Sequence, residues 1–318
     1  MAQPEYLLNQ LRLLSGRSDV TNLIDAWMAY FTAHGVPLMS LADRVSYHAM
    51  LRGLTPAQVW AGNIEAPSLQ FITAARGFAL DAGNISTLWQ DVAGTVPVTA
   101  AGQAVARVDD VSGKGNHALQ ATVAAQPLYQ VDAFGNGYLQ FDGVDDQLVV
   151  AALDLSTELQ ATLLLAARRD SPSQTDIILE QGASFTALPG AFMVNLTASN
   201  QLRFNVAQAA GNSTLGYAVT SPSDTSWVAS ARIVPSGPAI EDTVQNLRIG
   251  RDNPTTAYLG VVDPVATLAA GDVFIGARSG PANPFAGRLY GAAVRSGGVS
   301  SADQQRLMDY YLCKIGAV

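Results

Sequence analysis

The spacing of apolar residues near the N-terminus is helical. Apolar side chains recur every three or four positions within residues 19–34, and shorter stretches at 7–14 and 41–51 show the same spacing. Thr55 can cap a fourth helix, because Pro56 follows at the first helical position and Gln58 lies three residues after the cap. We therefore expect residues 1–66 to form a small helical domain.

After about residue 70 the repeat changes from helical to alternating. Leu202, Phe204 and Val206 alternate with polar neighbours, as in a half-buried strand. Clusters of Gly, Pro, Ser and Asp separate such segments. The other strands that we expect are Tyr138–Phe141, Gln147–Ala152, Thr162–Arg169, Ile177–Glu180, Phe192–Leu196, Trp227–Val234, Asn246–Arg251, Val273–Ala277 and Leu289–Arg295. Many short strands without long helices between them predict a mainly β protein, an antiparallel β-sandwich over residues 67–318.

The chain is expected to close with a helix. Ser301–Gln304 has the pattern of a capping box, and Gly316 can end the helix. One apolar stripe follows the cap, made of Leu307, Met308, Tyr311, Leu312 and Ile315. The stripe predicts that this helix packs on the sandwich or on a neighbouring subunit.

The amino-acid composition excludes some classes of binding partner. Charged residues make up only 14% of the 318 residues, and the net charge is -8. No basic stripe is present to neutralise phosphates, so we expect neither nucleic acid nor an anionic membrane as a partner. No run approaches the ~20 apolar residues of a membrane span, and the first residues do not resemble a secretory signal. Cys313 is the single cysteine, so no internal disulfide can form.

Three stretches in sequence order resemble a known family. Val108–Gln120 is similar to its Asp-x-Ser-Gly-x-Gly-Asn turn, and Tyr138–Leu148 is similar to its Phe-Asp-Gly strand and turn. Phe285–Arg295, with Tyr311–Lys314 after it, resembles its last strand and terminal segment. The family is the LamG-like, concanavalin A-like jelly roll of bacteriophage and bacterial surface proteins. The resemblance covers residues 76–318 and implies a jelly roll with a lectin-like role.

Ile85–Thr99 also resembles a segment that precedes this domain in phage virion proteins. The resemblance implies a virion structural protein, tail-fibre or baseplate-associated, that is assembled in the bacterial host cytoplasm. Its N-terminal helices would dock on other virion proteins and its sandwich would face a host glycan. Virion proteins usually assemble symmetrically, so we expect a homo-oligomer. The alternatives are a capsid decoration protein that stabilises the shell and a polysaccharide-degrading enzyme.

Catalytic patterns are sparse in the sequence. Glycoside hydrolysis needs a pair of carboxylates, but none of the five Glu falls in a paired motif and Glu180 stands alone on its strand. No Gly-x-Ser-x-Gly elbow or zinc motif is present, and Gly113–Ala118 matches a dinucleotide loop without the βαβ context it requires. We therefore expect a protein that is not an enzyme.

The resemblance to the LamG-like family implies that a Ca²⁺ ion can be bound at a loop edge. Calcium is therefore the one cofactor for which we expect candidate ligands in this sequence. Hard oxygen ligands are available at Asp109, Asp110, Asp142, Asp145 and Asp146. The alternative is structural. Asp110, Ser112 and Asn116 can bond nearby amides, while Gly113 and Gly115 allow a tight reversal.

A sugar site would need an exposed aromatic platform beside hydrogen-bonding side chains. The aromatic residues in or near predicted loops are Trp89, Tyr217, Tyr258 and Phe285. They are the candidate ligand-binding residues. The alternative for each is that it packs locally.

Overall fold

The computed structural model describes residues 76–132, 135–170, 174–218, 226–250 and 252–315. The expected helical domain over residues 1–66, its boundary with the sandwich, and Gly316 lie outside the described residues. The remaining predictions can be compared with the structure.

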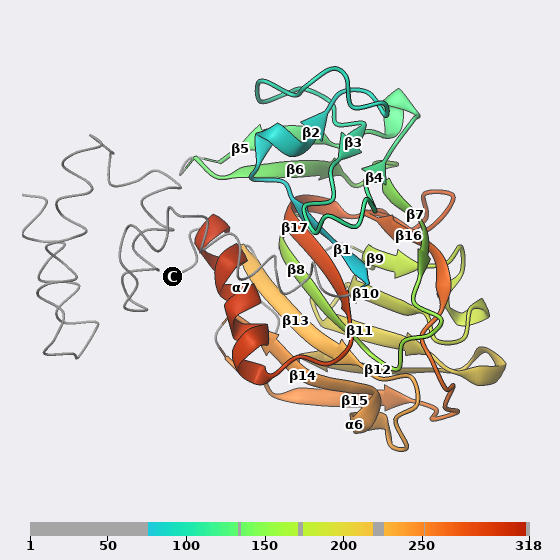
Figure 1. Ribbon diagram of the computed structural model, residues 1–318. Coiled ribbons are helices and arrows are strands. Elements are labelled where there is room, and N and C mark those ends of the chain that lie inside the picture. The colour runs from blue at the N-terminus through green and yellow to red at the C-terminus, as the bar shows by residue number, and fades with distance from the viewer. Residues whose placement is uncertain (1–75, 133–134, 171–173, 219–225, 251, 316–318) are drawn as a thin grey trace, which may run out of the picture.

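Two antiparallel sheets make up most of the described part of the chain (Figure 1). The first, sheet A, has the order β14 (Val244–Ile249), β13 (Trp227–Ile233), β8 (Ala161–Arg169), β17 (Ala286–Ser296), β6 (Gly137–Asp142) and β5 (Leu128–Val131), with β1 (Gly77–Asp81) also paired to β17. The second, sheet B, has the order β15 (Thr256–Gly260), β12 (Ser213–Ala218), β11 (Leu202–Ala207), β10 (Phe192–Leu196), β9 (Asp176–Gln181), β16 (Ala270–Ile275), β7 (Leu148–Asp154), β4 (Ala118–Leu119), β3 (Arg107–Val108) and β2 (Leu88–Trp89). The α-helices among the described residues are α6 (Ile240–Thr243) and α7 (Ser301–Ile315).

The main core lies between the sheets. Phe78 and Phe141 from sheet A and Phe192 and Phe204 from sheet B are all within one cluster of buried side chains, each at most 1% exposed. Alternating apolar residues supply this cluster from both inner faces, as expected of a sandwich. The predicted mainly β fold with two antiparallel sheets is therefore confirmed.

α7 covers the outer face of sheet A (Figure 1). The Tyr311 hydroxyl donates to the Leu80 carbonyl oxygen at 2.9 Å. A Cβ at Gly291 would lie 2.1 Å from the Tyr311 ring, so only glycine allows this close approach. The predicted packing of the terminal helix on the sandwich is confirmed. The predicted cap is wrong by one residue, because it is the Ser300 hydroxyl that accepts from the Asp303 amide at 3.1 Å.

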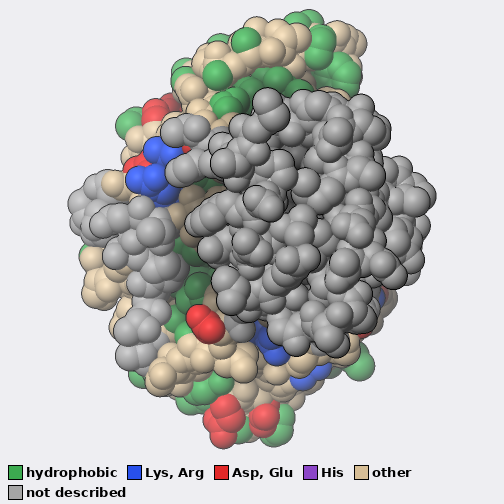
Figure 2. Space-filling view, turned by 90° about the vertical axis from the view of Figure 1, so that its left-hand side faces the viewer, with side chains coloured by type: hydrophobic (Ala, Val, Ile, Leu, Met, Phe, Trp, Pro, Cys, Tyr) green, Lys and Arg blue, Asp and Glu red, His purple; other side chains and the backbone are tan. Residues whose placement is uncertain are grey.

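All ten predicted strands are present, most of them with shifted ends. β10 has the predicted bounds, whereas β14 begins at Val244 and ends at Ile249 instead of spanning 246–251. Seven strands were not predicted: β1, β2, β3, β4, β5, β12 and β15. Among the described residues, no helix has the length and apolar character needed to cross a membrane. Charged side chains are few on the described part of the face in Figure 2, in line with the composition.

Candidate functional site

Trp89 lies in a cluster of polar side chains at the β2 end of sheet B. Its indole Nε1 donates to Oδ2 of Asp109 at 2.7 Å, and Nε of Arg107 donates to Oδ1 at 2.7 Å. His117 Nδ1 lies 3.0 Å from the same Oδ1, and His117 Nε2 lies 3.4 Å from Nη2 of Arg107. Nδ1 also lies 3.1 Å from the Asp110 backbone nitrogen, so the protonation of the ring decides which neighbour it bonds. We call these four side chains, Trp89, Arg107, Asp109 and His117, the Trp89 cluster.

Strand register places the Trp89 cluster on the outer face of sheet B. Leu88, Val108 and Ala118 are directly paired across β2, β3 and β4, and all three lie in the core. Successive strand residues point to opposite faces. Trp89 and Arg107, which are also paired, therefore point away from the core. The side chains of Arg107, Asp109 and His117 are 22%, 24% and 31% exposed, so solvent reaches them.

Asp110 has a structural role in the neighbouring turn. Its Oδ1 accepts from the Ala79 and Ser112 amides, both at 2.9 Å, and its Oδ2 accepts from the Asn116 amide at 3.0 Å. The side chain is 7% exposed. These bonds join the Gly-rich turn to β1, in agreement with the alternative reading of this turn as architecture.

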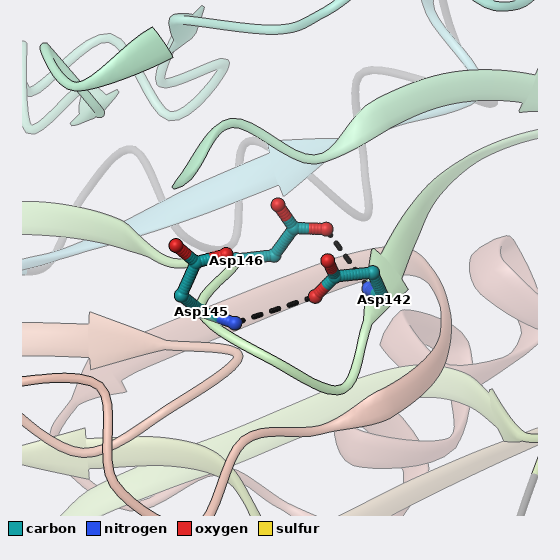
Figure 3. A group of neighbouring side chains, drawn as sticks. All are labelled: Asp142, Asp145 and Asp146. Carbon is teal, nitrogen blue, oxygen red and sulfur yellow. Dashed lines mark hydrogen bonds between the residues drawn. The ribbon is translucent and has the colours of Figure 1, made fainter. Parts of the chain in front are cut away.

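Only part of the predicted calcium set comes together in the described structure. Asp142, Asp145 and Asp146 have carboxylate oxygens within 4.8 Å of one another, in the turn between β6 and β7 (Figure 3). Asp109 and Asp110 do not belong to this group. Asp146 Oδ2 accepts from the Asp142 amide at 2.8 Å.

Burial and the neighbouring carboxylates in this turn disfavour the ionised form of the Asp146 side chain. Burial, with smaller contributions from the charges of Asp142 and Asp145, raises its pKa to about 6, and the hydrogen bond from the Asp142 amide opposes this shift. Asp142 Oδ1 accepts from the Val144 amide at 2.8 Å. The three carboxylates supply fewer oxygens than the six or more that Ca²⁺ takes, so backbone carbonyls or water would have to complete the coordination. The predicted calcium site stays a prediction.

Tyr217 and Tyr258 lie on neighbouring strands of sheet B, and their side chains point to opposite faces of the sheet. Tyr217 of β12 pairs with Ala257, the residue before Tyr258 in β15. The guanidinium of Arg203 lies 5.6 Å from the Tyr217 ring centroid. Tyr258 instead lies over Gly216, where an added Cβ would be 3.2 Å from its ring. Burial raises the pKa of Tyr258. The two rings do not form one platform.

The predicted place of Phe285 on a loop surface is wrong. Its side chain is 1% exposed, and its ring lies 6.0 Å from that of Phe141 at an angle of 50°. Phe285 comes directly before β17, where the apolar ring joins the core instead of facing solvent. It cannot serve as a sugar platform in this structure.

Glu180 forms an ion pair that the sequence did not predict, with Arg278, whose side chain is 33% exposed. The Glu180 side chain is fully buried, and Arg278 Nε donates to its Oε1 and Oε2 at 3.1 and 2.9 Å. The Phe185 amide also donates to Oε1, at 2.9 Å. Arg278 is 98 residues away in the sequence, so no local motif could have indicated the pair.

Comparisons with known proteins assign no family to this chain. No protein-family description matches it, and no curated protein matches it.

Three solved structures with a similar arrangement of strands are distant from this chain in sequence. A CBM40 domain of Ruminococcus gnavus IT-sialidase bound to alpha2,3 sialyllactose has 12% identity and a TM-score of 0.37 over 48% of this chain and 83% of its own. The ligand-binding domain of botulinum neurotoxin serotype D in complex with N-acetylneuraminic acid has 8% identity and a TM-score of 0.47 over 76% of this chain. An arabinofuranosidase complexed with arabinofuranosyl-alpha-1,2-xylobiose has 10% identity and a TM-score of 0.44 over 67% of this chain. The chain spans 52% and 51% of the last two structures, about half of each.

Proposed function

We propose that this protein is a non-catalytic recognition protein whose β-sandwich binds a glycan at the Trp89 cluster. The observation that carries the proposal is the hydrogen bond from the Trp89 indole to Asp109, beside Arg107 and His117 on an outward face. Sugar sites combine an aromatic ring with fixed polar groups that orient hydroxyls. Here the ring and the polar groups are held together before any ligand arrives, which lowers the entropy cost of binding.

A glycan array probed with the full chain tests this proposal. We expect Trp89→Ala to abolish binding and Trp89→Phe, which keeps an aromatic ring, to retain part of it. Tyr217→Ala is the matched control, because Tyr217 is an aromatic residue on the outer face of the same sheet, far along the strand order. Circular dichroism checks that each variant is folded. Absence of binding by the unaltered chain, or equal loss in the Tyr217 variant, contradicts the proposal.

The absence of catalysis is part of the proposal and is supported by the state of Glu180. Both of its carboxylate oxygens are engaged by Arg278, and the Phe185 amide adds a third bond. The Glu180 side chain is fully buried, so it is not presented to solvent, where a polysaccharide would have to meet it. Turnover of a polysaccharide by the full chain that is lost on Glu180→Gln would show instead that the protein is an enzyme.

We propose a phage particle as the setting, with the protein on a tail fibre or baseplate. The support is the resemblance of Ile85–Thr99 to a segment of phage virion proteins, together with three motifs that resemble a domain of bacteriophage and bacterial surface proteins. Mass spectrometry of purified particles, followed by cryo-electron microscopy, tests this placement. Density on the tail supports the proposal, and absence from the particle contradicts it.

A capsid decoration protein is the second candidate, and one surface favours it. The segments 92–104 and 118–131 contain no charged residue and lie side by side, since Gly102 N–H bonds the Tyr129 carbonyl at 2.8 Å. Several apolar side chains on them are exposed, from 38% to 74%: Val92, Val96, Val123, Leu128 and Val131. An uncharged apolar surface suits burial against another shell protein. Density on the capsid lattice would select this alternative.

A further inference from the structure

Arg278, just after β16, is held in place through both its backbone and its side chain. Its amide donates to the Ala282 carbonyl at 2.9 Å, and its carbonyl accepts from Gln147 Nε2 at 2.8 Å. Its Nε donates to both carboxylate oxygens of Glu180. Because these bonds fix the direction of the guanidinium, little side-chain entropy remains to be lost when a ligand binds it.

The outer end of the Arg278 guanidinium carries donors without strong partners. Nη2 contacts Met193 Sδ at 3.9 Å, and sulfur is a weak acceptor. In the part of the chain that the structure describes, no acceptor bonds Nη1. The side chain is 33% exposed, so solvent reaches it. Two N–H groups at the end of a guanidinium match the two oxygens of a carboxylate.

Glu180 orients Arg278 and leaves this outer end available. Its carboxylate is fully buried, and the cost of removing a carboxylate from water offsets much of its attraction to a cation. The pair is therefore poorly explained by stability alone. All of its hydrogen bonds to Arg278 go to Nε, so the two Nη groups stay free for a second anion.

Arg278 reaches over the outer face of sheet B. Glu180 pairs with Met193 across β9 and β10, and Met193 pairs with Asn205 across β10 and β11. The residues on either side of Met193 lie in the core, so these paired side chains point outward. Directly paired residues on one face have Cβ atoms about 4.5–5.5 Å apart. Arg278 and Asn205 therefore flank Met193 at a spacing that one sugar ring can span.

Asn205 and Asn195 present one donor and one acceptor beside Met193. Asn205 Nδ2 donates to the Met193 carbonyl at 3.1 Å and to Asn195 Oδ1 at 2.9 Å. A carbonyl can only accept, so this contact fixes the orientation of both amides.

The remaining amide atoms of this pair have no partner. Neither Asn205 Oδ1 nor Asn195 Nδ2 is hydrogen-bonded within the described residues, although the two residues are only 3% and 4% exposed. Polar groups in such buried side chains normally have a partner. Neither atom is completely buried, so a ligand can reach both. A hydroxyl, which donates and accepts, satisfies one donor and one acceptor together.

We propose that Arg278, Asn195 and Asn205 bind a sugar acid. Its carboxylate lies on Nη1 and Nη2 of Arg278, and one of its hydroxyls lies on the asparagine pair. A sugar acid fits better than a simple carboxylate because it carries both groups. The site is at β9–β11, whereas the Trp89 cluster is at the β2 end of the same sheet, so it is a second site that does not depend on the function proposed for that cluster.

Saturation-transfer difference NMR with the full chain tests the proposal, with glucuronate, glucose and acetate as probes. One sugar held by two groups should bind with about millimolar affinity, which ligand-observed NMR detects and a washed glycan array does not. Glucose and acetate should bind about tenfold more weakly than glucuronate, because each lacks one of the two groups. No binding of glucuronate, or equal binding of either other probe, overturns the proposal.

Arg278→Lys should weaken glucuronate binding about tenfold, since lysine keeps the charge beside Glu180 but lacks the planar fork. Arg168→Lys is the matched control, because Arg168 is 34% exposed and also paired with a carboxylate, on sheet A. It should bind glucuronate as the unaltered chain does. The double variant Glu180→Gln/Arg278→Gln leaves no buried charge and should lose binding as well. Urea unfolding checks that each variant is folded, and unchanged binding in either Arg278 variant overturns the proposal.

Two further variants separate the parts of the proposal. Asn205→Ala should lower glucuronate binding to the level of acetate, because the hydroxyl loses its acceptor. Trp89→Ala should leave glucuronate binding unchanged. Loss of glucuronate binding in Trp89→Ala and not in Arg278→Lys would place the acid at the Trp89 cluster and overturn the second site. Absence of glycan binding at the Trp89 cluster, in contrast, would leave the result at Arg278 unaffected.

Discussion

The indole of Trp89 donates to Oδ2 of Asp109 at 2.7 Å, and these two residues are 20 positions apart in the sequence. The bond joins β2 to the turn after β3, and Asp109 also holds Arg107 on the same side of the sheet. A carboxylate that accepts from both an indole and a guanidinium fixes the orientation of each. The surface proposed to bind a glycan is therefore preorganised by one aspartate.

A double-mutant cycle should measure this coupling. Trp89→Phe removes the donor and keeps an apolar ring, so we expect a loss of about 1.5–3 kcal/mol in the free energy of unfolding, as for a hydrogen bond to a charged group. Asp109→Ala should cost more, because Arg107 and His117 lose a partner as well. Urea unfolding of both single variants and the double variant gives the coupling energy. Strictly additive losses would mean that the bond contributes nothing to stability.

The sequence predicted the long strands well and the Trp89 cluster poorly. β10 and β11 were found because their apolar residues alternate, as Leu202, Phe204 and Val206 do in β11. β2, β3 and β4 have two residues each, which is too short for any periodicity. Their register, which brings Trp89 opposite Arg107, arises only in the folded sheet. The sequence therefore named Trp89 and Asp109 separately, as ligand and metal residues, and did not predict that they meet.

Two further strands, β12 and β15, were not predicted because of their glycines. β12 and β15 each contain a glycine, which reads as a turn signal. In the structure Gly216 makes room for the Tyr258 ring on the next strand, and a Cβ at Gly260 would lie 2.1 Å from the Ser213 carbonyl oxygen. Close approach to a neighbouring strand requires glycine at both positions, and Gly260 also has a positive φ of 123°.

Asp146 should make stability depend on pH. Its pKa is about 6 in the folded protein, compared with 3.8 for an unperturbed group, so the folded state holds a proton more tightly than the unfolded state. Stability from this group is full below about pH 4 and is lost as the pH rises through 6. The total loss is about 2–3 kcal/mol from the size of the shift.

Asp146→Asn should remove this dependence, because an amide cannot ionise and its oxygen can still accept from the Asp142 amide. Urea unfolding at pH 4, 5, 6 and 7.5 measures it. We expect the variant to be more stable than the unaltered chain at pH 7.5 and nearly equal at pH 4. Asp145→Asn, at a more exposed position in the same turn, serves as the control: it removes a charge that contributes least to the raised pKa of Asp146, so the dependence on pH should remain, with its midpoint slightly lower. An unchanged profile in the Asp146 variant would contradict the assignment.

The same variants test the predicted calcium site. Asp142, Asp145 and Asp146 offer three carboxylates, of which Asp142 and Asp146 already accept backbone amides, so any Ca²⁺ affinity should be in the weak range of about 10⁻⁴–10⁻³ M. Millimolar CaCl₂ at pH 7.5 should then raise the unfolding temperature of the unaltered chain. The rise should be absent in Asp146→Asn and kept in Asp109→Asn. A rise that survives in Asp146→Asn would place the ion elsewhere.

Arg169 and Asp176 form a buried ion pair whose removal should be costly. Arg169 Nε donates to Asp176 Oδ2 at 2.7 Å, with 2% and 0% of the side chains exposed, and Nη1 bonds the Thr197 carbonyl. Burial raises the pKa of Asp176, which Arg169 opposes. Arg169→Met would leave the carboxylate buried without its cation, so we expect a loss of about 3–5 kcal/mol at pH 7. Arg168→Met is the matched control, because the adjacent Arg168 is 34% exposed and lies 3.6 Å from Asp170, and its loss should stay within about 1 kcal/mol. Equal losses in the two variants, measured by urea unfolding, would show that burial does not set the cost of breaking these pairs.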